Sequence, residues 1–217
     1  MSIIVAMLSM VEILRTGPEP GEDDKVDRIA AAALDQFARY GIRRSTIDDV
    51  AKRAGVSRVT VFRRFTNKER LVEFVVAREI RRGMRELDHA WVGGTLEDRL
   101  VHGFSFAMRF TRSHPLFGRL LESEPEVVLP LMTVDGGPAL GLYRSLIAQR
   151  LNDEALAKRA APGDVEGAAE VIARLAMSLL LTPDGVINLD DQDSVRAFVR
   201  LALLPMLRPN DEPDPRM

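Results

Sequence analysis

The amino-acid sequence predicts an all-α protein in which a small N-terminal helical bundle continues into a larger C-terminal one. Apolar residues recur at three- and four-residue steps along most of the 217-residue chain. Alternating strand patterns bounded by turn dipeptides are absent from the sequence. Two short helical patterns joined at Ala54-Gly55 add a helix pair to the first bundle. Together these observations predict a two-domain helical fold.

The predicted helices follow one another in order. The first begins after an acidic stretch ending at Asp24, which favours a helix N-terminus, and it stops at Gly41. Its apolar stripe consists of Val26, Ile29, Ala30, Ala33, Leu34, Phe37 and Ala38. The next helices are expected at residues 46–53, 57–64, 67–87, 95–112, 116–122, about 138–151, 164–181 and 193–204.

Both ends of the chain are expected to lie outside the helical body. Residues 1–14 are largely apolar, but no basic residue precedes them, no clear cleavage site follows, and they are too short to span a membrane. We therefore expect residues 1–24 to form a variable arm and no membrane to be a partner. The proline-rich, acidic residues 208–217 are expected to form a mobile tail.

The composition narrows the possible functions. The absence of cysteine excludes a disulfide framework, a thiolate zinc site and a cysteine nucleophile, and it is compatible with a cytoplasmic protein. The net charge of -2 hides a strong asymmetry. Residues 25–85 carry sixteen basic and seven acidic side chains, or +9, whereas residues 1–24 carry -4 and residues 86–217 carry -7. This pattern is expected when only the first domain contacts a polyanion.

Residues 45–65 contain the signals of a helix-turn-helix. Thr46 and Asp49 have the spacing of a capping box, with Asp in place of the usual Glu or Gln. Gly55 permits the left-handed backbone of a tight turn, Val56 fills the angle between the helices, and Ser57 caps the second helix.

The second helix of this motif has two different sides. Val61 and Phe65 are expected to pack inward, while Val59, Thr60 and Arg63 face outward. An α-helix fits the major groove of B-DNA, where arginine can pair with guanine and an apolar group can touch the thymine methyl. The predicted DNA-binding residues are Arg43, Arg44, Thr46, Ser57, Arg58, Val59, Thr60, Phe62, Arg63, Arg64 and Lys68.

The run from Ile29 to Leu71 resembles the DNA-binding domain of the TetR family of bacterial transcriptional regulators. The matching segments are Thr46-Ile-Asp-Asp-Val-Ala, Ala54-Gly-Val-Ser57 and Phe62-Arg-Arg-Phe-Thr-Asn-Lys68-Glu-Arg-Leu71. The resemblance implies a homodimer that binds an operator in double-stranded DNA, usually as a repressor, and leaves it when a small-molecule effector enters the C-terminal domain.

The resemblance also implies individual roles. Thr46, Arg64 and Lys68 would contact phosphates, and base readers would be Arg58, Thr60 and Arg63. Two positions depart from the family pattern. Phe62 stands where tyrosine is most common, which removes a hydroxyl contact, and Val59 stands where a small residue is common, which adds methyl contact.

The expected architecture is therefore a three-helix helix-turn-helix DNA-binding domain at residues 25–70 joined to a helical effector-binding and dimerisation domain at residues 71–207. The broad apolar stripes of the last two helices suit a dimer interface, with the candidates Ile172, Leu175, Leu179, Phe198 and Leu201. Candidates for a hydrophobic effector pocket are Phe104, Met108, Phe117, Leu121, Met132, Tyr143 and Ile147. Plain core packing is an alternative for both sets.

Other functions receive less support from the sequence. The dispersed His89, His102 and His114 do not predict a metal site, and no cofactor motif is present. A small-molecule enzyme on the same scaffold remains an alternative, with carboxylates at Glu122, Glu124 and Glu126, but an acidic surface turn around Pro125 explains these residues more simply. We therefore expect no enzyme. A DNA-binding protein without an effector is the other alternative.

Overall fold

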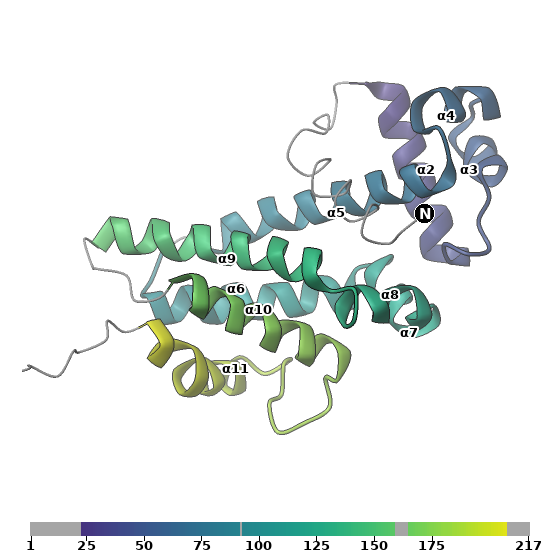
Figure 1. The fold of residues 1–217 in the computed structure, drawn as a ribbon. Coiled ribbons are helices and arrows are strands. Elements are labelled where there is room, and N and C mark those ends of the chain that lie inside the picture. The colour runs from purple at the N-terminus through teal and green to yellow at the C-terminus, as the bar shows by residue number, and fades with distance from the viewer. Residues whose placement is uncertain (1–22, 92, 159–164, 208–217) are drawn as a thin grey trace, which may run out of the picture. The chain divides into compact units, whose positions relative to one another are not determined.

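The computed structural model describes residues 23–91, 93–158 and 165–207, and the regular secondary structure of these residues consists of helices without a strand. The predicted all-α fold is thus confirmed (Figure 1). The helices are α2 (Asp24–Tyr40), α3 (Ile47–Ala54), α4 (Arg58–Phe65), α5 (Lys68–Ala90), α6 (Leu96–Ser113), α7 (Phe117–Ser123), α8 (Pro125–Met132), α9 (Gly137–Lys158), α10 (Val165–Leu181) and α11 (Gln192–Phe198). A π turn, η1 (Val199–Leu203), and a 3-10 turn, η2 (Leu204–Leu207), end the described chain. The predicted tail, and all of the arm except Asp23 and Asp24, lie outside the described residues.

The helix boundaries of the first bundle follow the local chemistry of the sequence. The side chain of Asp23 accepts hydrogen bonds from the first turn of α2, and Gly41 ends that helix with a φ of 82°. Thr46 and Asp49 form the predicted capping box of α3. Gly55 takes the left-handed conformation (φ 65°, ψ 35°), and Ser57 caps α4. The turn chemistry predicted for this segment is therefore confirmed.

Two differences from the predicted helices concern proline. The sequence analysis expected an acidic surface turn around Pro125 and no helix between residues 122 and 138, so α8 was not predicted. Pro125 instead occupies the first turn of α8, where its missing N–H costs nothing, while Pro130 lies inside the helix. The last predicted helix, 193–204, ends as an α-helix at Phe198 and continues as the π turn and the 3-10 turn, the latter containing Pro205.

The described chain divides into two compact units. Unit 1 consists of residues 23–86 and 110–138, and unit 2 consists of residues 87–109 and 139–207 without the undescribed positions. Within unit 1, α2 packs on α3 and α3 on α4. The fully buried side chains of its core include Ile29, Phe37, Val50, Val61, Leu71, Val75 and Leu116. The ring of Phe65 meets that of Phe74 edge-on at 5.2 Å, which fixes α4 against α5.

Unit 2 has its own core. Its most buried side chains include Val101, Met108, Ala169, Val195, Val199 and Leu203, and the rings of Phe104 and Phe198 lie 5.3 Å apart. On its surface, Arg196 pairs with Glu97 at 2.9 Å and with Asp98 at 2.8 Å, which ties α11 to the start of α6. These contacts join segments about one hundred residues apart in the sequence.

Candidate nucleic-acid interface

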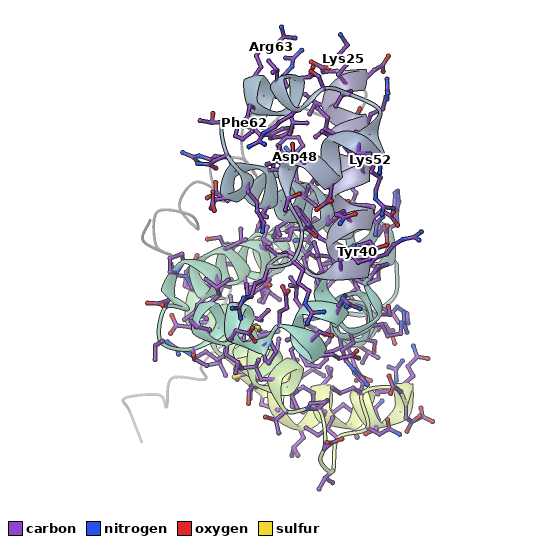
Figure 2. The ribbon with its side chains drawn as sticks, turned by 90° about the vertical axis from the view of Figure 1, so that its right-hand side faces the viewer. Lys25, Tyr40, Asp48, Lys52, Phe62 and Arg63 are labelled. Carbon is purple, nitrogen blue, oxygen red and sulfur yellow. The ribbon has the colours of Figure 1, made fainter. Side chains whose placement is uncertain are left out.

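Helix α4 has an exposed side with both apolar and basic residues and a buried side with Val61 and Phe65. Val61 and Phe65 are buried in the unit 1 core, whereas Val59 is 75% exposed and Arg63 is also exposed. Phe62 is partly exposed, and the guanidinium of Arg58 lies 5.2 Å from its ring centroid. Figure 2 shows Phe62 and Arg63 on the outer side of this helix. The burial pattern therefore agrees with the inward and outward sides expected from the sequence.

The hydroxyl groups of the two N-cap residues, Thr46 of α3 and Ser57 of α4, are held by local hydrogen bonds. The backbone N–H of Thr46 donates to Asp49 Oδ2 at 2.9 Å, and its hydroxyl donates to the same oxygen at 2.6 Å. These hydrogen bonds lower the pKa of Asp49. The hydroxyls of Ser57 and Thr60 lie 2.8 Å apart. A phosphate at Thr46 would therefore compete with Asp49 for the donors of this residue.

Several of the predicted DNA-contacting cations already have a partner within unit 1. Arg58 pairs with Asp48 at 2.9 Å, Arg64 with Asp23 at 2.8 Å, and Arg43 with Glu126 at 2.6 Å. Such exposed pairs contribute about 0–1 kcal/mol each, so a DNA phosphate can replace the carboxylate. In the described part of the chain, Arg44 and Arg63 have no ion pair.

The loop between α2 and α3 is held by the carboxylate of Glu124, which comes from a distant part of the sequence. We expected Glu124 in an acidic surface turn, but it is only 7% exposed. Its carboxylate accepts hydrogen bonds from the backbone N–H of Ile42 at 2.9 Å and of Arg43 at 3.2 Å. A Cβ at Gly41 would collide with Oε1 of the same carboxylate. Glu124 is therefore a buried ligand of the loop that carries Arg43 and Arg44.

His114 has a core role. Its Nδ1 accepts a hydrogen bond from the backbone N–H of Leu116 at 3.2 Å, so Nε2 carries the proton and donates to Glu79 at 3.1 Å. Burial opposes the ionisation of Glu79, but the hydrogen bond from His114 and the charge of Arg82 outweigh it and lower its pKa. His89 and His102 are exposed. Among the residues that the structure describes, no three His, Cys, Asp or Glu side chains group as a metal site would require.

The candidate effector residues fall in both units. In unit 2, Phe104 and Met108 are buried, while Tyr143 and Ile147 are half-buried. In unit 1, Phe117, Leu121 and Met132 are half-buried, and the ring of Phe117 stacks on that of His114 at 4.4 Å. Their assignment to an effector pocket stays a prediction.

The candidate dimer residues differ in how much surface they leave available. Ile172 and Phe198 are buried in the core of unit 2. Leu175 and Leu179 are half-buried, and Leu201 is 82% exposed. Only the last three retain apolar surface that a partner could cover.

None of the described helices is both long enough and apolar enough to cross a lipid bilayer. The described helices thus offer no candidate membrane span.

The caps, the turn and the exposed basic face of α4 define the chain as a helix-turn-helix DNA-binding protein. Residues 29–75 match the family described as bacterial regulatory proteins, tetR family. The N-terminal domain is thus similar to that of TetR family transcriptional regulators, and the relatives that match more of the chain are HTH-type transcriptional regulators and not enzymes. The expectation that it is no enzyme is thereby confirmed.

Similar proteins cover different shares of the chain. An uncharacterized HTH-type transcriptional regulator of Mycobacterium bovis is 26% identical over 184 residues, which are 83% of this chain and 95% of that protein. The uncharacterized regulator YhgD of Bacillus subtilis is 28% identical over 105 residues, which are 48% of this chain and 55% of that protein. The structure of the TetR family repressor AlkX from Dietzia sp. superposes with a TM-score of 0.59 at 20% identity, covering 88% of this chain and all of that one.

Proposed function

We propose that the protein is a cytoplasmic homodimeric repressor that binds an operator through α4 and is released by a small hydrophobic effector. The observation that carries the proposal is the exposed face of α4, where Val59 and Arg63 project from a helix anchored by Val61. In this proposal the two α4 helices of a dimer enter successive major grooves, about 34–36 Å apart or a multiple of that distance. The phosphate contacts come from Arg43, Arg44, Thr46, Arg64 and Lys68.

The DNA-binding part is tested by selecting bound duplexes from a random pool and then measuring variants over a range of salt concentrations. Arg58→Ala and Arg63→Ala should each lose about 1–3 kcal/mol of discrimination against a mismatched base pair. Lys68→Ala should weaken binding to all sequences and lower the salt slope by about 1 per protomer. If all three variants bound the selected operator like the unmodified chain, the assignment of this face would be wrong.

The effector part rests on the continuity of α5 and on the candidate pocket residues. Helix α5 runs without interruption from Lys68, next to the helix-turn-helix, to Ala90 in unit 2. An effector that binds more tightly when α5 takes another orientation would change the distance between the two α4 helices of the dimer and weaken operator binding. A screen of hydrophobic compounds for release of the selected operator tests this step. If no compound releases the DNA, the proposed effector step is wrong, and the alternative is a regulator that works without an effector.

The dimer part is supported by exposed apolar side chains of unit 2. Leu201 on η1 and Val171 on α10 are exposed, and Leu175 lies one turn after Val171. Leu201→Glu combined with Val171→Glu should convert the dimer to a monomer in analytical ultracentrifugation. Val186→Glu is the matched control, because Val186 is fully exposed in the segment between α10 and α11. Equal sedimentation of the two variants would contradict this interface.

A further inference from the structure

Unit 1 contains a second basic feature beside the helix-turn-helix. It is an open hollow of about 680 Å³ lined by the end of α2, the loop after it, α3 and α7. Figure 2 shows two of its lining residues, Tyr40 and Lys52, on the right of the view, with Phe62 of the helix-turn-helix on the left. The cations that line it are Arg39, Arg44, Lys52, Arg53 and Arg119.

The carboxylates near the hollow form ion pairs with only two of its five cations. Asp35 is shared by Arg39, at 2.7 Å, and by Arg53. Asp49 also lines the hollow, but its Oδ2 already accepts from the backbone and hydroxyl of Thr46. Within the described residues, the side chains of Arg44, Lys52 and Arg119 have no ion pair or hydrogen bond. An anion entering the hollow would therefore meet net positive charge.

Arg119 is the half-buried cation of the hollow, whereas the other four cations that line it are exposed. Its Nε is buried and has no hydrogen-bond partner among the described residues. A buried charged donor without an acceptor is unfavourable, and such groups in native proteins are usually satisfied by a partner. A guanidinium offers parallel N–H donors that match the oxygens of a phosphate. Nε itself is closed to solvent, so a phosphate in the hollow would bind the other N–H groups of the Arg119 guanidinium, and the charge of Lys52 would balance the anion.

The hollow also borders the predicted DNA contacts. Arg44, which lines it, lies two residues before Thr46, and Asp49 belongs both to the hollow and to the capping box of α3. A phosphate of the DNA backbone beside the half-site is thus one source of the anion, and a free phosphorylated small molecule is the other. We propose that this hollow binds a phosphate group. Apart from Arg44, the residues that line the hollow are not among the operator contacts proposed above, and only the DNA source of the phosphate rests on those contacts.

The first experiment needs no DNA. The full chain, labelled with ¹⁵N in arginine, is titrated with inorganic pyrophosphate at constant ionic strength, and the Nε–H resonance of Arg119 is assigned with Arg119→Lys. We expect a saturable shift of this resonance and a loss of about fivefold or more in pyrophosphate affinity in Lys52→Gln. The matched control is Arg112→Gln, which removes an exposed charge of unit 1 that does not line the hollow. An unsaturable shift, or equal affinities of Lys52→Gln and Arg112→Gln, would overturn the proposal.

The second experiment distinguishes the two sources. The selected operator is prepared as a short duplex that ends at the half-sites and as a duplex extended on both sides. If the DNA backbone supplies the phosphate, Lys52→Gln lowers the salt slope by about 1 per protomer on the extended duplex only. If a free molecule supplies it, the slopes are unchanged and pyrophosphate binds the DNA complex as tightly as the free protein. Failure of the operator selection would leave the pyrophosphate experiment valid, so the two proposals fail separately.

Discussion

Replacing Glu124 tests how the loop before the helix-turn-helix is held. In the structure this buried carboxylate accepts two backbone hydrogen bonds, from Ile42 and Arg43, across about eighty residues of sequence. Glu124→Ala removes the acceptor and leaves both N–H groups without it. We expect the loop that presents Arg43 and Arg44 to loosen, because no other side chain in the described residues accepts from these two N–H groups.

The size of the stability loss in Glu124→Ala follows from the two hydrogen bonds that this carboxylate accepts. A hydrogen bond to a charged group contributes about 1.5–3 kcal/mol, and the lower end applies here because both bonds are only partly buried. Glu124→Ala should therefore lower the free energy of unfolding by about 2–4 kcal/mol and the Tm by about 5–15 °C for a chain of this size. Glu124→Gln keeps the shape and one acceptor oxygen, so we expect about half of that loss.

Thermal unfolding and operator titration measure the two consequences. Operator affinity should fall in the order unmodified chain, Glu124→Gln, Glu124→Ala, because the loosened loop must be ordered again on binding. Glu122→Ala is the matched control, since Glu122 is an exposed glutamate on the preceding helix. If Glu124→Ala and Glu122→Ala had the same Tm and the same operator affinity, the reasoning would be refuted.

Two further predictions concern unit 2. Gly103→Ala should destabilise the chain by about 1–3 kcal/mol and alter the fluorescence of the single tryptophan, because a Cβ at Gly103 would lie 2.6 Å from the ring of Trp91. Gly141→Ala, where a Cβ meets nothing within 4 Å inside α9, should instead stabilise it by about 0.5–1 kcal/mol, and a loss of stability in both variants would contradict the packing argument. The hydrogen bond from Arg196, with those from Thr95, holds the pKa of Asp98 well below its ordinary value. The ionised Asp98 carboxylate therefore stabilises the folded chain fully above about pH 4, and this stabilisation is lost as the pH falls further. The difference in free energy of unfolding between the unmodified chain and Asp98→Asn should therefore shrink as the pH falls below 4. A difference that stays constant with pH would contradict this role of Asp98.

The sequence predicted the helix-turn-helix well because its signals act over three or four residues. Thr46 reaches Asp49, Gly55 sets its own backbone angle, and Ser57 reaches Thr60, so each feature is readable locally. The role of Glu124 was not readable in this way, because its partners lie about eighty residues away and no periodic pattern connects them. Helix α8 was missed for a different reason: the sequence analysis expected an acidic surface turn around Pro125, and only the fold places Pro125 in a first turn.

The hollow and the ion pairs on the DNA-binding side show the same limit. Charge counting identified residues 25–85 as basic, but it could not tell which arginines already contact carboxylates. The pairing of Arg43 with Glu126 depends on α8, and the orphaned Nε of Arg119 depends on α7 packing near α3. Long-range packing therefore decides which cations are available, and the composition alone overestimates their number.

The paired arginines have a consequence for how the regulator finds its site on a chromosome. Non-specific attraction to DNA comes almost entirely from cations that displace counterions from phosphates. Because Arg58 and Arg64 keep carboxylate partners, a random stretch of duplex must exchange those partners before it gains the full attraction. We therefore expect a short residence time on mismatched DNA. Both arginines should exchange their carboxylates for DNA phosphates or bases only where a matching major groove holds α4 in register.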